Sequence, residues 1–250
     1  MTRPLQLVAP SLTLDQLLAE SPWFMSLDES ARRQVRADAS ERSIAMGQSL
    51  GHHGDQQHVW FGMLEGLIKW SITAHDGRAV TLGGQSVGSW FGEGTLIRKT
   101  PRQSDLIALR DSRVAQIPLG TFDWLRRHQP SFNEFLLMQV NERLHWFMGN
   151  VAAHGLLDTD SLVARALVGM VHPLLNPRGE RHLQLSQEEL ANLAAVSRQT
   201  CNKAIMRFKD GGLVRTEYGG LVVLDLSGLQ ALAQQLTSVE RKLSVNPDAR

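Results

Sequence analysis

The stretch from Leu185 to Val214 constrains the fold of this chain more than any other, because it contains two helix-start signals close together. Ser186 is followed three residues later by Glu189, a spacing typical of the capping box at a helix N-terminus. Ser197 supplies a second start signal after the small residues at 194–196. At helical spacing, the following residues divide into an apolar side (Cys201, Ala204, Ile205, Phe208) and a polar side (Arg198, Gln199, Asn202, Lys203, Arg207). We therefore expect a helix, a tight turn and a second helix.

The polar side of the second helix is basic, although the whole chain carries a net charge of only +1. Arg198, Lys203, Arg207 and Lys209 lie in this segment with no acidic residue among them. Arginine and amide side chains near a helix N-terminus can form paired hydrogen bonds with base edges in the major groove, and basic residues further along neutralise phosphates. The segment predicts a DNA-reading helix, and a solvated surface helix is the structural alternative.

A hairpin is predicted after this helix. Gly211 and Gly212 can end the helix, and apolar runs at 213–216 and 221–224 flank Glu217-Tyr218-Gly219-Gly220. The Gly-Gly pair in that turn can adopt positive φ. Helix, turn, helix and hairpin together predict a winged helix-turn-helix.

The N-terminal half has a different texture. Residues 13–39 predict helices broken at Pro22, and short alternating apolar runs between glycines at 41–118 predict an antiparallel β-roll or jelly roll. Ser131 and Glu134 then predict a capping box that opens a long helix ending near His154. This helix carries apolar residues at heptad spacing, which predicts a dimer seam, with packing on its own β-roll as the alternative: Leu137, Val140, Leu144, Phe147 and Val151.

The chain resembles the Crp/Fnr superfamily of bacterial transcription regulators. SRQTCNK at 197–203 is similar to the recognition-helix motif of that family, with Gln199 and Lys203 where glutamate and arginine are common. The pieces Gly47, Gly54-Asp55, Leu64-Glu65-Gly66 and Gly88 before Gly92-Glu93 are similar to its cyclic-nucleotide-binding fold. The resemblance implies an α+β protein with an effector-sensing, jelly-roll β-roll and flanking helices (1–130), a dimerisation helix (131–156), a winged helix-turn-helix (157–236) and a flexible tail (237–250).

The resemblance also assigns binding residues. The DNA-binding residues are Ser186, Gln187, Ser197, Arg198, Gln199, Asn202, Lys203 and Arg207. The effector-binding residues are Gly92, Glu93, Arg102, Gln103, Ser104 and Arg143. In the family, the glutamate accepts the ribose hydroxyl and the arginine holds the cyclic phosphate, a charge-assisted contact. An internal ion pair between Glu93 and Arg102 is the alternative.

The effector itself stays open at this point. Gln103 stands where members that bind cyclic AMP usually have serine or threonine, and Phe147 and Met148 stand where they present hydroxyl residues to adenine. A cyclic nucleotide (cAMP or cGMP), another effector, or ligand-independent action all remain compatible with these residues. The partners that the resemblance implies are double-stranded DNA with an inverted-repeat operator, a second copy of the chain and RNA polymerase.

Other classes of function find weaker support. His52, His53, His58 and His75 with Glu65 raise the alternative of a metal-dependent enzyme on the β-roll, but adjacent histidines on a strand point to opposite faces. We therefore predict histidines in turns, no metal and no enzymatic activity. The chain has one cysteine, too few for a cysteine-ligated zinc or iron–sulfur site, so we expect Cys201 to be a buried core residue and exclude the oxygen-sensing branch of the family. Apolar runs are shorter than a membrane span and a signal peptide is lacking, which predicts a cytoplasmic protein.

Overall fold

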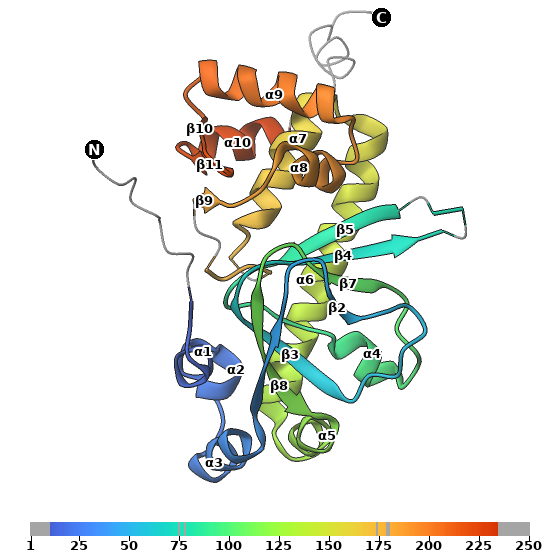
Figure 1. Cartoon of the computed structure of the whole chain (residues 1–250). Helices are drawn as coiled ribbons and strands as arrows, with labels where there is room; N and C mark the ends of the chain where they lie inside the picture. Colours follow the sequence, from blue (N-terminus) through green and yellow to red (C-terminus); the bar gives the residue numbers. More distant parts are fainter. Residues whose placement is uncertain (1–10, 75, 78, 174, 179–180, 235–250) are drawn as a thin grey trace, which may run out of the picture. The chain divides into compact units, whose positions relative to one another are not determined.

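The computed structural model describes residues 11–74, 76–77, 79–173, 175–178 and 181–234. The chain divides into two units, one formed by Met1–Val140 with Leu174–Arg178, the other by Asn141–Pro173 with Gly179–Arg250 (Figure 1). The tail predicted at 237–250 lies outside the described residues. Among the helices that the structure describes, none combines the length and apolar character that crossing a membrane requires.

Three helices begin the first unit: α1 (Leu14–Glu20), α2 (Pro22–Met25) and α3 (Glu29–Asp38). Thr13 and Gln16 form a capping box at the start of α1, and the carboxylate of Asp28 accepts from the backbone N–H of Ala31 to cap α3. The predicted break at Pro22 is confirmed, since Pro22 is the first residue of α2, a position where the missing N–H of proline costs nothing.

Two four-stranded antiparallel sheets follow, which confirms the β-roll (Figure 1). One has the order β1 (Ser40–Ile44), β8 (Ser112–Pro118), β3 (Val59–Glu65), β6 (Trp90–Phe91). The other has the order β2 (Ser49–Gly51), β7 (Asp105–Ala108), β4 (Ile68–Thr73), β5 (Ala79–Gln85). Five glycines of the family resemblance have positive φ, namely Gly47, Gly54, Gly66, Gly88 and Gly92. At Gly66 a Cβ would lie 2.6 Å from the carbonyl oxygen of Asp111.

An aromatic cluster forms the core between the helices and the first sheet. Trp23, Trp60, Trp90 and Phe132 are all buried, and the rings of Trp60 and Trp90 have centroids 4.5 Å apart. The unit also contains α4 (Glu93–Arg98) and α5 (Leu119–His128), and the buried Phe122 of α5 joins the same cluster. The sequence analysis did not identify α5.

The long helix α6 spans Pro130–Leu156. Its predicted start was wrong by one residue: Pro130 already belongs to the helix, so Ser131 is not the cap, and its hydroxyl donates to the carbonyl oxygen of Ser26 at 3.4 Å. Proline favours the first helical turn because that turn needs no backbone donor there. Phe132 and Leu136 are buried in the core of the first unit, and Gln139 Nε2 donates to the carbonyl oxygen of Trp90 at 3.2 Å.

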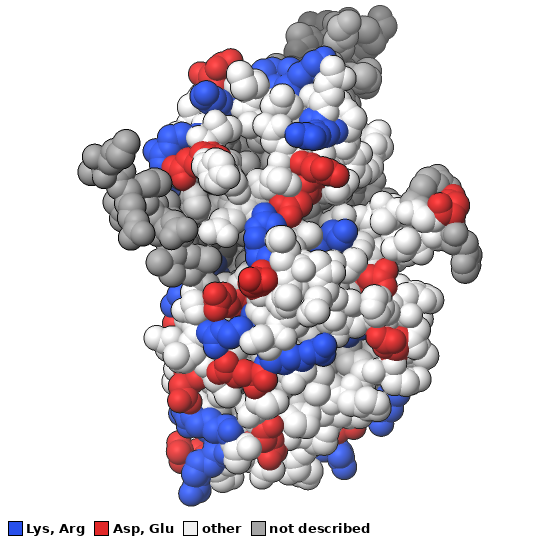
Figure 2. All heavy atoms as spheres, in the orientation of Figure 1, with Lys and Arg blue, Asp and Glu red and all other residues white. Residues whose placement is uncertain are grey.

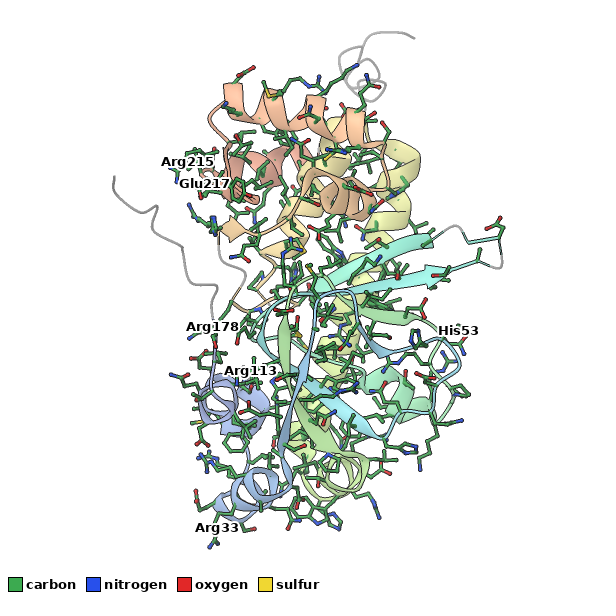
Figure 3. The ribbon with its side chains drawn as sticks, viewed as in Figure 1. Arg33, His53, Arg113, Arg178, Arg215 and Glu217 are labelled. Atoms are coloured by element: carbon green, nitrogen blue, oxygen red, sulfur yellow. The ribbon has the colours of Figure 1, made fainter. Side chains whose placement is uncertain are left out.

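Residues 175–178 belong to the first unit, although they follow α7 in the sequence. The buried Asn176 accepts from the backbone N–H and the hydroxyl of Ser86 through Oδ1, at 3.1 and 2.9 Å. Arg178 donates to both carboxylate oxygens of Glu20, at 2.7 and 2.6 Å (Figure 3). Asn176 and Arg178 thus hold this segment to the first unit by polar contacts that no local sequence signal indicates.

The second unit contains the predicted helix-turn-helix. Its elements are α7 (Thr159–Met170), β9 (His182–Leu183), α8 (Gln187–Ala194), α9 (Arg198–Asp210), β10 (Val214–Glu217), β11 (Gly220–Val223) and α10 (Leu226–Ala233). The capping box of Ser186 and Glu189 and the cap by Ser197 are both present, so the two helix starts are confirmed. Between α8 and α9, Ala195 has φ 52° and ψ 41°, a left-handed conformation that makes the turn tight.

The hairpin of β10 and β11 pairs with β9 to form a three-stranded sheet in the order β10-β11-β9. Glu217 pairs with Gly220, so Tyr218 and Gly219 form a two-residue turn. Only Gly219 of the predicted Gly-Gly pair has positive φ. Gly220 is required for another reason, because a Cβ there would lie 2.4 Å from the carbonyl oxygen of Leu183 on β9.

Candidate functional sites

The first candidate site is the outward face of α9. Cys201, Ala204, Ile205 and Phe208 are buried, as predicted, and this fixes which side of the helix faces outward. The opposite side exposes five of the residues assigned to DNA: Arg198, Gln199, Asn202, Lys203 and Arg207. In Figure 2, blue atoms of lysine and arginine lie along the surface that α9 occupies in Figure 1. The arrangement can present guanidinium, amide and ammonium groups to a nucleic acid.

The cations of α9 differ in their partners. Arg198, Lys203 and Lys209 form no ion pair with another described residue. Arg207, in contrast, donates through Nε and Nη2 to the two carboxylate oxygens of Asp160 on α7. The hydrogen bond to Asp160 raises the pKa of Arg207, and the carboxylate of Asp158 adds to this effect.

The start of α8 lies beside α9 through a side-chain bridge. Gln187 Nε2 donates to Asn202 Oδ1 at 3.0 Å, which orients the two amides that the sequence assigned to DNA. Ser186 accepts from the backbone N–H of Glu189 at 3.2 Å, and Ser197 accepts from the backbone N–H of Thr200 at 3.1 Å. Both hydroxyls are therefore engaged in capping, and all eight assigned residues lie on α8, α9 or their caps.

The hairpin and β9 carry a partly exposed polar cluster that the sequence analysis did not assign. Glu217 accepts from Arg215 through Oε1, at 2.7 and 3.1 Å, while Oε2 lies 2.9 Å from Nε2 of His182 on β9 (Figure 3). Arg215, and to a smaller degree His182, hold the pKa of Glu217 below its ordinary value. Tyr218 at the tip is fully exposed. The period-two pattern predicted the hairpin, but the pairing across β9 depends on the fold.

The second candidate site is the cassette around α4 in the first unit. Gly92 caps α4 with φ 94°, and Glu93 is 2% exposed, with its Oε2 accepting from Trp60 Nε1 at 3.4 Å. Arg102 is 5% exposed, and its Nη2 donates to Gln57 Oε1. The structure thus buries two of the three charged residues assigned to the effector, Glu93 and Arg102, within one unit.

Gln57 is the residue of this cassette that the sequence analysis missed. While its Oε1 accepts from Arg102, its Nε2 donates to the carbonyl oxygens of Gly92 at 3.0 Å and Val59 at 2.7 Å. It therefore connects the loop before β3 with the glycine that precedes Glu93. The two glutamines that follow Gly54-Asp55, Gln56 and Gln57, give no sequence signal for this role.

The remaining assigned residues have separate surroundings. Ser104 is buried and its hydroxyl accepts from Trp70 Nε1, whereas Gln103 is exposed and donates to the carbonyl oxygen of Pro101 at 3.3 Å. Burial lowers the pKa of Arg102, and the carboxylate of Asp55 opposes that shift. Arg143 belongs to the second unit, and its assignment to the effector site stays a prediction.

A third candidate surface is the apolar stripe on α6. Leu137, Val140, Leu144 and Val151 are 63%, 41%, 57% and 78% exposed in the single chain, and Phe147 is half-buried. Within the first unit, Leu137 and Val140 are thus not covered by the described residues of the β-roll, which does not fit packing of this part of the stripe on the β-roll. A second helix would cover an apolar stripe at this spacing.

The residues of the enzyme alternative do not converge. Within the described part of the chain, no three histidine, cysteine, aspartate or glutamate side chains lie close enough together to hold a metal ion. His52 and His58 are exposed, and His75 lies outside the described residues. Cys201 is buried as expected, and burial raises the pKa of its thiol to about 11.

Comparison with known proteins adds a second line of observations. Residues 41–129 match the family model described as a cyclic nucleotide-binding domain, and residues 163–232 match that of a Crp-like helix-turn-helix domain. The CRP-like cAMP-activated global transcriptional regulator of Mycobacterium tuberculosis is 24% identical over 225 residues, which cover 88% of this chain and 100% of the relative. The cAMP-activated global transcriptional regulator Vfr of Pseudomonas aeruginosa is 23% identical, over 82% of this chain and 97% of the relative.

Solved structures share the fold. FixK2 from Bradyrhizobium japonicum superposes with a TM-score of 0.67 at 14% identity, covering 79% of this chain and 98% of that one. The c-di-GMP responsive global regulator CLP of Xanthomonas campestris gives a TM-score of 0.58 at 20% identity, over 79% of this chain and 100% of that one. At these identities the likeness concerns the fold.

Proposed function

The chain belongs to the Crp/Fnr superfamily of transcription regulators, and from this premise we propose that it binds an inverted-repeat DNA operator as a homodimer under the control of a small effector. The observation that carries the proposal is the exposed face of α9, where Arg198 and Lys203 have no ion-pair partner among the described residues. A guanidinium near the start of the helix can bond guanine in the major groove, and a lysine one turn later can bond a phosphate.

Dimerisation follows from the exposed stripe on α6. A second copy would bury Leu137, Leu144 and Val151, which are now exposed, and each copy would present one α9 to the DNA. In helix-turn-helix dimers the half-sites lie about one helical turn apart, roughly 34 Å. Leu144→Glu should yield monomers in light scattering after gel filtration, whereas Met25→Glu, at an exposed apolar residue of α2, should leave the dimer intact. A wild-type protein that runs as a monomer at micromolar concentration would contradict the proposal.

For the effector we propose an anionic ligand with a phosphate group, a cyclic nucleotide first. The support is the cyclic nucleotide-binding domain match together with the buried side chains of Arg102 and Glu93 and the glycine at the start of α4. Arg102 would hold the phosphate and Glu93 a ribose hydroxyl. The relatives named above include cAMP-activated regulators and a c-di-GMP responsive one, so the nucleotide is a matter for experiment.

Thermal-shift titration with cAMP, cGMP and c-di-GMP tests this effector. We expect one of them to raise the melting temperature at micromolar concentration, Arg102→Ala to remove the shift, and Arg98→Ala to keep it, because Arg98 is an exposed arginine of α4. If none of the three changes the melting temperature, a differently gated or ligand-independent regulator becomes the better interpretation.

RNA polymerase and the cellular compartment complete the proposal. A regulator that binds promoter DNA acts where the polymerase acts, so we propose RNA polymerase as a protein partner and the cytoplasm as the place of action. Neither assignment changes the expectation that the chain is a regulator and not an enzyme, which rests on its relatives being transcription regulators. Co-purification of polymerase with operator-bound protein would test the partner.

A further inference from the structure

The end of α9 is tied to the start of α7 by one pair of side chains. Arg207 lies in the last turn of α9, and Asp160 lies in the first turn of α7, two residues after the cap residue Asp158. Arg207 Nε donates to Asp160 Oδ2 at 2.5 Å, and Nη2 donates to Oδ1. Two parallel hydrogen bonds between a guanidinium and a carboxylate fix direction as well as distance.

This pair distinguishes Arg207 from the other cations of α9. Arg198, Lys203 and Lys209 have no ion pair with a described residue, so a phosphate can approach them without displacing a protein partner. At Arg207, a phosphate would compete with the bound carboxylate of Asp160 and would also meet the charge of Asp158, which acts on the same guanidinium. The surroundings of Arg207 therefore oppose a second anion.

The packing beneath the pair explains what it can contribute. α7 and α9 are in contact, and most of their buried residues are apolar, among them Ala164, Leu167, Ala204 and Ile205. Such packing restricts the angle between two helices but leaves a scatter of about 15 to 20°. A bidentate polar pair at the edge of the contact adds a directional constraint that narrows this angle.

We propose that Arg207 is a positioning residue: its bidentate bond to Asp160 sets the orientation of α9 on α7, and its guanidinium does not contact DNA. The proposal revises the assignment of Arg207 to the DNA-contacting residues and adds Asp160 to the residues on which DNA binding depends. It also goes beyond the proposed function, because it separates the cations that contact DNA from the one that orients them.

Three variants, two single and one double, test the proposal on a DNA duplex that the wild-type protein selects from a random pool. Arg207→Lys keeps the charge but loses the fork, Asp160→Asn removes the acceptor charge, and Arg207→Asp combined with Asp160→Arg restores the pair in reverse. We expect the two single variants to bind about three- to fivefold more weakly and the reversed pair to recover most of the loss. The slope of log affinity against log salt should stay at the wild-type value in all three.

Lys203→Ala is the matched control, because loss of a phosphate contact reduces the magnitude of the slope of log affinity against log salt by about 0.9 in duplex DNA. Thermal unfolding of each variant confirms that the domain is folded. A phosphate contact at Arg207 would give the opposite set of results. Arg207→Lys would bind like wild type, and Asp160→Asn would bind more tightly because the arginine is released. A fourth variant, Arg207→Ala, would reduce the magnitude of the salt slope. Any of these three results overturns the proposal, while a lowered slope in Lys203→Ala still supports DNA binding by α9.

Discussion

Arg198 on α9 and Arg102 in the cassette are both assigned to phosphate-bearing ligands, yet their surroundings differ. Arg198 is exposed and forms no ion pair with a described residue, whereas Arg102 is 5% exposed and donates to Gln57. A DNA ligand would meet a cation that has no ion-pair partner among the described residues. An effector would meet a cation that already has a protein acceptor.

The difference between the two arginines indicates which contacts each region loses when it binds its ligand, and therefore the free-energy cost of binding. At Arg198 the main cost is dehydration of the guanidinium, because no ion pair with a described residue has to break. At the cassette, breaking a hydrogen bond to a charged group costs about 1.5 to 3 kcal/mol, which a charge-assisted phosphate contact must offset. The DNA-binding face is therefore assembled before its ligand arrives, while the cassette exchanges an internal bond for an external one. Gln57 also donates to the carbonyl oxygen of Gly92, so a change in the partner of Gln57 can alter the contact that it makes at the start of α4.

The largest expected effect concerns Arg198, the cation without an ion pair to a described residue. Arg198→Ala should weaken operator binding by about 1 to 3 kcal/mol and relax base preference, because a paired contact to a base edge is lost. Fluorescence anisotropy with the selected duplex and a scrambled duplex measures both quantities. Arg33→Ala is the control, since Arg33 is an exposed arginine of α3 (Figure 3). Equal affinities of Arg198→Ala and Arg33→Ala for the selected duplex would remove Arg198 from the interface.

An intermediate effect is expected at Arg102, the buried cation that donates to Gln57. Gln57→Ala leaves the buried guanidinium of Arg102 without its acceptor, which should destabilise the first unit by about 2 kcal/mol. Urea unfolding followed by tryptophan fluorescence reports this, because Trp23, Trp60 and Trp90 lie in the core of that unit. Gln56→Ala, at the exposed neighbouring residue, should be neutral. If Gln57→Ala were equally neutral, Arg102 would not depend on its internal acceptor.

The smallest effect is expected on the buried side of α9 and only at high pH. Burial raises the pKa of Cys201 from 9.0 to about 11, so the folded state binds this proton more tightly than the unfolded state. The resulting stability is complete below about pH 9 and is lost as the pH rises through about 11. Between pH 8 and about 11, the free energy of unfolding should therefore fall more steeply with pH for wild type than for Cys201→Ala. Parallel curves would show that the thiol is accessible to solvent in the folded protein.

The sequence predicted best where a signal is local. Ser186 with Glu189 and Ser197 begin helices because a cap and its donor lie within one turn of chain, and Gly219 shows the predicted positive φ for a similarly local reason. Ser131 shows the limit of such signals, since a proline that can itself begin the helix displaced the predicted cap by one residue.

Contacts between distant residues escaped the sequence analysis. Gln57 reaches the carbonyl of Gly92 across 35 residues, and Arg207 reaches Asp160 across 47, and neither pair has a spacing that a helix or strand pattern would indicate. Helix α5 was missed as well, because its buried Phe122 and Leu125 follow a proline at the end of β8 with no side-chain cap. The family resemblance supplied the types of site residue, and the fold supplied their partners.

The central claim is that two copies of α9, related by a two-fold axis, read one operator together. The most direct test inserts about half a helical turn, roughly 5 base pairs, between the half-sites of the selected duplex, which turns them to opposite faces of the DNA. We predict two chains bound per original duplex and at least a tenfold loss of affinity for the lengthened one, a difference of about 1.4 kcal/mol. One chain per duplex, with an affinity that does not depend on the spacing, would contradict the account.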